Sequence, residues 1–168
     1  MKDLGVLISS NMNFTEQTRD VVLRANRRTN FITRAFQVTE VDVYIQLFRT
    51  YILPIITYAS PVWLPKNKGD KELLQSVYRR FRRKIAFKCN VNKDLIGNLD
   101  ICDTLCDIDR KTFEDLKKLP ELYDEMFDFI ETKTRSQGLH RPKFLAKTEK
   151  LKGLFPWRVT APNNKPLC

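Results

Sequence analysis

A dense run of basic residues is the part of this chain best suited to chemistry. Five arginine and lysine side chains occupy the six positions from Arg79 to Lys84, and Phe81 alone interrupts them. The planar guanidinium of arginine offers several hydrogen-bond donors in fixed geometry, which suits phosphate recognition. Many like charges on one rod repel one another unless a polyanion or acidic neighbours offset them. The run therefore predicts contact with a nucleic-acid backbone, and a solvated helix face balanced by acidic residues is the alternative.

Other reactive side chains are arranged less favourably. Cys89, Cys102, Cys106 and His140 could supply four zinc ligands, but two cysteines four residues apart also share one helix face, where buried free cysteines are common. The carboxylates between positions 100 and 115 have no glycine-bearing calcium loop and no partner histidine. The sequence also lacks a Gly-x-Ser-x-Gly elbow and a glycine-rich phosphate loop. We therefore expect no catalytic residues, no metal site and no cofactor.

The basic run is expected to lie on a helix that Asp70 caps. Apolar residues recur at helical spacing, so one face would be buried and the opposite face basic. The apolar face would hold Leu74, Val77, Tyr78, Phe81 and Ile85, and the basic face Arg79, Arg80, Arg82 and Arg83.

An earlier helix is expected from Phe14 to Phe36, because its stripe residues recur at alternating spacings of four and three. Asn13 or Thr15 could cap it. Its arginines mostly fall off the stripe and could extend the basic surface. The candidate nucleic-acid-binding residues are Arg27, Arg28, Arg79, Arg80, Arg82, Arg83, Lys84 and Lys88.

A second helix is expected to begin at Thr39, where the sequence up to Asp42 resembles a capping box. Pro54 should kink it, because proline removes a backbone donor and clashes one turn back. The dipeptide at positions 60–61 should end it. Its apolar circumference predicts the buried hub of the domain. Trp63, with Tyr58, could stack on a base, but an aromatic that follows a buried helix more often belongs to the core.

The remaining segments complete a mainly α fold. Residues 4–8 (LGVLI) form the one strand that we expect, and two acidic helices should cover 99–119 and 120–130. The predicted organisation is a strand remnant at 1–13, a helical bundle-like domain at 14–131 and an irregular basic tail at 132–168.

Charge is strongly segregated along the 168 residues, whose net charge is +10. Residues 66–93 carry 10 basic and 2 acidic groups, residues 94–131 carry 4 and 12, and residues 132–168 carry 9 and 1. The acidic block either lies against a basic one or is a solvated face. No window approaches the roughly 20 apolar residues of a membrane span, and no signal peptide is evident. The four cysteines follow no disulfide framework. We expect an intracellular protein, nuclear or cytoplasmic, without a membrane partner.

The order of segments resembles the C-terminal part of a non-LTR (LINE-type) retrotransposon reverse transcriptase. The resemblance rests on LGV at 4–6, ANR at 25–27, LF at 47–48, LP at 53–54, YASPVW at 58–63 and VYRR at 77–80, and it covers roughly half of the chain. It implies the post-palm thumb or connection region of such a polymerase, with the palm strand ending at LGV.

This resemblance implies binding rather than catalysis. In the family, palm aspartates of a Tyr/Phe-Ala-Asp-Asp motif hold two magnesium ions upstream of the LGV strand, and no such motif occurs here. We expect a truncated, domesticated or degenerate copy, not an enzyme, whose basic helix contacts RNA or DNA. A helical protein–protein module with an acidic partner is the alternative. A non-functional remnant reading frame is another, since an exposed strand edge would hinder independent folding.

Overall fold

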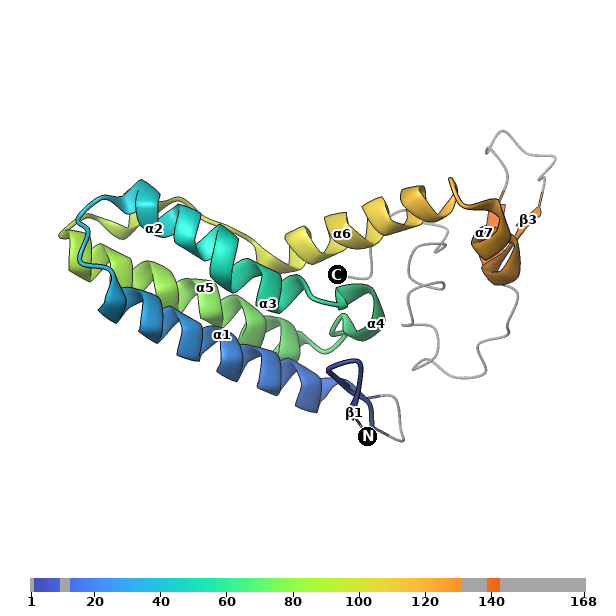
Figure 1. Ribbon diagram of the computed structural model, residues 1–168, viewed down its shortest axis with the longest axis horizontal. Helices are drawn as coiled ribbons and strands as arrows, with labels where there is room; N and C mark the ends of the chain where they lie inside the picture. The colour runs from blue at the N-terminus through green and yellow to red at the C-terminus, as the bar shows by residue number, and fades with distance from the viewer. Residues whose placement is uncertain (1, 10–12, 131–138, 143–168) are drawn as a thin grey trace.

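The fold is mainly α, as predicted. The computed structural model describes residues 2–9, 13–130 and 139–142, so the expected irregular tail falls largely outside the described residues. Helical segments occupy most of the described chain (Figure 1). The helices are α1 (Thr15–Ala35), α2 (Val41–Leu47), α3 (Leu53–Thr57), α4 (Ser60–Trp63), α5 (Lys68–Cys89), α6 (Ile101–Leu116) and α7 (Pro120–Met126), with a π-helix η1 (Phe48–Ile52) and a 3-10 helix η2 (Lys93–Ile96). The strands are β1 (Lys2–Asp3), β2 (Val6–Leu7), β3 (Phe127–Ile130) and β4 (Leu139–Pro142).

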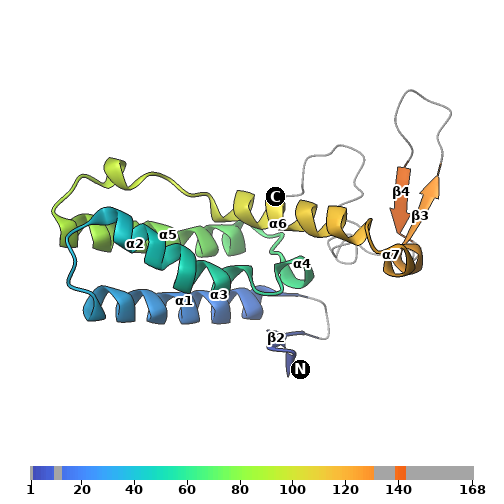
Figure 2. The same ribbon diagram turned by 45° about the horizontal axis from the view of Figure 1, so that its top comes forward.

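Two long helices, α1 and α5, pack side by side and form the frame of the domain (Figures 1 and 2). Contacts advance in the same direction along both, from Thr15 with Asp70 at the start to Asn30 with Lys84 nearer the end, so the helices run parallel. The predicted apolar stripe of α5 is confirmed, because all five of its residues are buried. In α1 the stripe residues from Thr18 to Ile32 are buried as well.

One face of the segment from α2 through η1 to α3 packs against the α1 and α5 helices. Tyr44, Phe48, Ile52 and Ile56 are each spaced by four residues, and all are buried. In a regular α-helix such a series would drift by about 40° per step, and the wider π-helical turns of η1 reduce that drift. The π-helix directly precedes Pro54, where the sequence predicts a kink, because a ring without an N–H cannot continue the regular ladder.

Two helix boundaries in this region differ from the predictions. The expected capping box at Thr39 is wrong, since α2 begins after Glu40 without a side-chain cap. Ser60-Pro61 does not end a helix but begins α4, because Ala59 adopts a left-handed conformation (φ 51°) that breaks the chain direction first. Trp63 on α4 is fully buried and donates from Nε1 to the carbonyl of Tyr58 at 2.8 Å, so its core role is confirmed.

The predicted single strand at residues 4–8 is wrong. Leu4 and Gly5 both have positive φ (42° and 87°) and form the turn of a β1–β2 hairpin, as two-residue hairpin turns require. The turn rests on the Tyr58 hydroxyl, which donates to the carbonyl of Leu4 at 2.9 Å. Gln17 of α1 accepts from the amide of Leu7 at 2.8 Å and holds the second strand.

The C-terminal elements of the described chain leave the main core. Helix α6 is preceded by Asp100, whose carboxylate caps it by accepting from the amides of Cys102 and Asp103. Its far end, with α7 and β3, forms a separate small cluster around Phe113 and Phe127. The expected helix over 120–130 ends early, because residues 127–130 pair antiparallel with 139–142, a strand that the predicted irregular tail did not include. No helix of the described residues has both the length and the apolar character to cross a bilayer.

Candidate nucleic-acid interface

The basic face of α5 is positioned by the burial of its opposite side. Because Leu74, Phe81 and Ile85 are held in the core, the arginines at 79, 80 and 83 project outward and are exposed. The helix begins at Lys68, two residues before the predicted cap. Asp70 instead lies buried in the first turn, where its carboxylate accepts from the Thr15 hydroxyl at 2.8 Å. That contact fixes the start of α5 against the start of α1.

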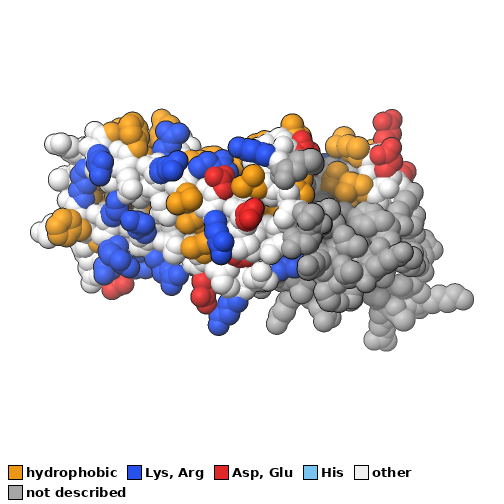
Figure 3. All heavy atoms as spheres, turned by 90° about the horizontal axis from the view of Figure 1, so that it is seen from below, with side chains coloured by type: hydrophobic (Ala, Val, Ile, Leu, Met, Phe, Trp, Pro, Cys, Tyr) orange, Lys and Arg blue, Asp and Glu red, His pale blue; other side chains and the backbone are white. Residues whose placement is uncertain are grey.

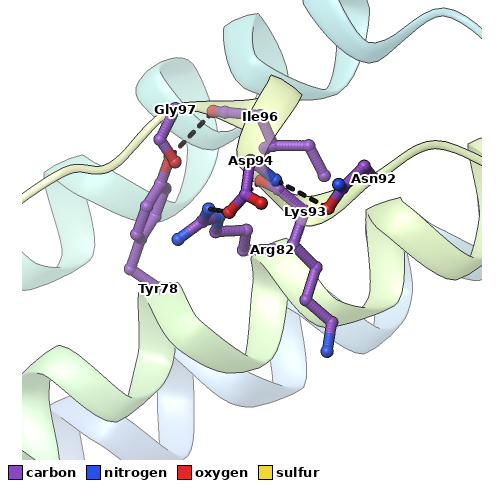
Figure 4. Close-up of polar contacts among 7 residues, drawn as sticks. All are labelled: Tyr78, Arg82, Asn92, Lys93, Asp94, Ile96 and Gly97. Atoms are coloured by element: carbon purple, nitrogen blue, oxygen red, sulfur yellow. Dashed lines mark hydrogen bonds and ion pairs between the residues drawn. The ribbon is translucent and has the colours of Figure 1, made fainter.

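Arg82 belongs to the same run but has a structural role. Its Nε donates to the carbonyl of Lys93 at 2.8 Å, and its Nη2 lies 3.3 Å from the carboxylate of Asp94 (Figure 4). Tyr78, one turn earlier, donates to the carbonyls of Ile96 and Gly97 at 3.3 and 3.4 Å. Burial raises the pKa of this tyrosine above its ordinary value of 10.0. Arg82 and Tyr78 thus hold η2 against α5, and the side chain of Arg82 is largely covered.

Lys84 and Lys88 point to the other flank of α5, toward α1. The Lys84 ammonium donates to the side-chain oxygen of Asn30, and Lys88 donates to the carbonyls of Thr33 and Phe36. The pKa of Lys84 is lowered by burial and by the nearby charges of Arg80 and Arg34. The ammonium groups of both lysines are therefore used to join the two helices. Arg34, one of the first-helix arginines that the sequence suggested could extend the basic surface, is a basic neighbour of Lys84 from α1.

The α1 candidates Arg27 and Arg28 are exposed, as is Arg34. Viewed from the side on which α1 lies, lysine and arginine side chains spread over one half of the molecule with few acidic groups among them (Figure 3). Arg24 differs, because its Nε pairs with Asp20 at 2.9 Å on the same helix. The sequence did not identify two exposed phenylalanines among these arginines, Phe31 and Phe87. Their positions outside the apolar stripes of the two helices could have indicated their exposure.

The ion-paired carboxylates of the acidic block (residues 94–131) mostly pair with basic residues close to them in sequence rather than with α5. Its ion pairs in the described chain join Arg110 to Asp107, Lys117 to Glu114 and Lys118 to Asp115, all three residues apart. Asp94, which forms an ion pair with Arg82, is the residue through which the acidic block contacts the basic run in the described part of the chain. Between the two predicted alternatives, the described residues favour a locally paired, solvated acidic face.

Metal-ligating side chains do not gather in the described part of the chain, where no group of three or more His, Cys, Asp or Glu residues could hold an ion. Cys89 and Cys102 are free thiols whose pKa values are raised, in both cases mainly by burial.

Comparison with known proteins gives one distant relative. A segment of 92 residues is 26% identical to the uncharacterized protein B0403.1 of Caenorhabditis elegans and covers 55% of this chain. The match spans 46% of the worm protein, so the chain corresponds to about half of that relative's length. No family model and no solved structure matches the chain.

Proposed function

We propose that this chain is a non-catalytic, nucleic-acid-binding segment of a non-LTR reverse transcriptase, and that α5 contacts the phosphate backbone. The observation that carries the proposal is the exposure of Arg79, Arg80 and Arg83. All three guanidinium groups are exposed, and no carboxylate of the described residues forms an ion pair with them. Arg79 donates from Nη2 to the carbonyl of Glu72 on its own helix at 3.2 Å, and its other donors, with those of Arg80 and Arg83, match what a row of phosphates requires.

The rigidity of the helix supports the same reading. Lys84 and Lys88 fasten one flank of α5 to α1, and Arg82 fastens the other flank to η2. The exposed arginines therefore project from a helix whose position is already fixed. Such preorganisation reduces the ordering cost of binding a charged strand.

A second support is the continuation of positive charge onto α1. The charges of Arg80 of α5 and Arg34 of α1 both lower the pKa of Lys84. Cations from the two parallel helices therefore lie near the line where α1 and α5 meet, which we call the seam. Arg27 and Arg28 are exposed on the same α1 helix. A surface of this kind could follow a strand across both helices.

The proposed family origin rests on the ordered segments between residues 4 and 80 that resemble such polymerases. In that resemblance this part of the chain follows the palm and grips the primer and template, while the palm holds the metal ions. The proposal accordingly assigns contacts, not chemistry, to these residues, with RNA or DNA as the partner.

The test is a binding titration of the full chain with fluorescently labelled RNA and DNA, repeated between about 50 and 200 mM salt. Replacement of Arg79, Arg80 and Arg83 by glutamine should weaken binding at least tenfold at the lower salt. It should also reduce the slope of log K against log salt by about two to three, since each lost phosphate contact contributes about 0.7 to 0.9. The matched control replaces Arg110 and Lys111 of α6 and Lys118, just after it, by glutamine, which also removes three charges and should change neither value appreciably.

Two results would contradict the proposal. One is the absence of binding at low salt by the unaltered chain. The other is equal weakening by the α5 and α6 variants, which would mean that net charge alone attracts the nucleic acid. Binding of poly-glutamate as tightly as of RNA or DNA would instead favour an acidic protein partner.

A further inference from the structure

Two phenylalanine rings lie on the basic surface with little protein around them. Phe87 of α5 is 92% exposed and Phe31 of α1 is 60% exposed. Each follows an exposed arginine by four residues, Arg83 and Arg27 respectively, and residues at this spacing share one face of a helix. Each ring therefore lies on the same helix face as an exposed arginine.

The two rings lie at the same level of the molecule. Lys84 reaches Asn30, the residue before Phe31, and Lys88, the residue after Phe87, reaches the carbonyls of Thr33 and Phe36. Because α1 and α5 run parallel, these contacts place positions 31 and 87 at the same level, near the C-terminal ends of the two helices that meet at the seam. Arg34 and Arg80 are close enough to that seam to shift the pKa of Lys84.

We infer that this surface binds single-stranded nucleic acid, with unpaired bases stacked on Phe31 and Phe87 while the neighbouring arginines hold the phosphates. The inference rests on the proposed function and specifies its ligand. Aromatic rings combined with a cationic track are the means by which proteins bind single strands without reading sequence. In a duplex the base faces are stacked on each other, so exposed rings on a helix surface gain nothing from it.

Charge decides between a nucleic acid and an apolar protein partner. Each ring shares a helix face with an exposed arginine, Arg27 or Arg83, and Arg34 of α1 and Arg80 of α5 both lie near Lys84. An apolar partner that covered the rings would also have to desolvate these guanidinium groups without pairing them, which is costly. A single strand offers flat base faces that can stack on the rings, together with anionic phosphates that can pair with the arginines.

The experiment compares a thymidine oligonucleotide longer than about 16 nucleotides, the upper site size of a single-strand-binding fold, with a duplex of equal length. The variant carries Phe31→Leu and Phe87→Leu, which keep apolar bulk and helix propensity but remove the aromatic faces. Because stacking of one base is worth about five- to 150-fold in affinity, the double variant should bind the single strand at least tenfold more weakly. Duplex binding should change by less than about twofold. Tyr51→Leu, an aromatic of 51% exposure on η1, is the matched control and should alter neither.

The outcomes separate the inference from the proposed function. Unchanged single-strand binding in the double variant, or an equal loss for duplex, would overturn the stacking role while leaving backbone binding intact. Failure of the unaltered chain to bind either probe would overturn the proposed function itself. If sedimentation showed that the unaltered chain self-associates and the double variant does not, the rings would be a protein-docking surface and the inference would be wrong.

Discussion

Residues of one type in the α5 run have different roles, and their neighbours decide which. Arg79 and Arg82 are three positions apart, yet Arg79 is exposed whereas Arg82 is bound to the η2 backbone. Lys84 has α1 beside it and donates to Asn30. The basic run therefore combines residues that fasten the helix with residues that remain available. The helical periodicity alone could not distinguish them, because η2 and α1 come from other parts of the chain.

Tyr78 provides a prediction of how stability depends on pH. Burial raises its pKa above 10.0 in the native state, so the native protein keeps the phenolic proton after the unfolded chain has lost it. The unfolded state then binds fewer protons, and stability falls as pH rises above 10. The contribution is constant below that pH. Tyr78→Phe should reduce this alkaline loss, measured by denaturant unfolding from about pH 8 to 11.

The same substitution should lower stability at neutral pH by only about 0.5–1.5 kcal/mol, because it removes long hydrogen bonds to two carbonyls. The control is Tyr51→Phe, whose exposed hydroxyl has no comparable burial. An alkaline stability profile identical in the Tyr78→Phe variant and the unaltered chain would show that this hydroxyl is not buried.

At the scale of elements, hydrophobic periodicity predicted the buried faces of single helices. It did not predict structures that require two separate segments to come together. The α1 and α5 stripes were correct because alternating spacings of three and four leave one possible buried face. The β1–β2 hairpin was missed because Leu4 is an unusual residue at positive φ. Tyr58, distant in sequence, supports that turn. Similarly, β3 depends on residues 139–142, which local propensity could not associate with it.

The pairing of α1 with α5 gives a prediction that belongs to this scale. Thr15 and Asp70 join the two helix starts by one hydrogen bond of 2.8 Å, and the carboxylate is buried in the first turn of α5. Removing the Thr15 hydroxyl leaves the buried carboxylate with the longer hydrogen bond from the Asn67 side chain at 3.4 Å. Thr15→Val and Asp70→Ala should each lower the free energy of unfolding by about 1–3 kcal/mol.

The pair should also be coupled in a double-mutant cycle by about 1 kcal/mol, measured by urea unfolding. The matched pair for comparison is Asp20 with Arg24, which are partly exposed and one turn apart on one helix. Its coupling should be no more than about 0.5 kcal/mol. Additive effects of the Thr15 and Asp70 substitutions would show that the helix starts are held by packing alone.

At the scale of the whole molecule, opposite charges are separated rather than paired. Three carboxylates of α6 form ion pairs with basic residues three positions further along the chain, and α5 keeps its exposed arginines without carboxylate partners in the described chain. The molecule therefore retains a repulsive surface that a single polyanionic ligand would relieve. The proposed affinity for nucleic acid and the charge repulsion in the free protein would have the same origin.

This common origin predicts opposite responses to salt from two sets of substitutions. Arg79, Arg80 and Arg83 repel one another and Lys84 at spacings of three and four, each such pair costing about 0.2–0.5 kcal/mol. Their replacement by glutamine should therefore raise stability by about 0.5–1 kcal/mol at low ionic strength, and the gain should vanish near 1 M sodium chloride, where the screening length falls to about 3 Å. Replacement of Arg110, Lys111 and Lys118 removes ion pairs with Asp107 and Asp115 and should instead lower stability slightly at low salt. Urea unfolding across the salt series measures both. A loss of stability in the α5 variant at low salt would mean that its arginines already have anionic partners within the chain, and the surface would then not be free to receive a nucleic acid.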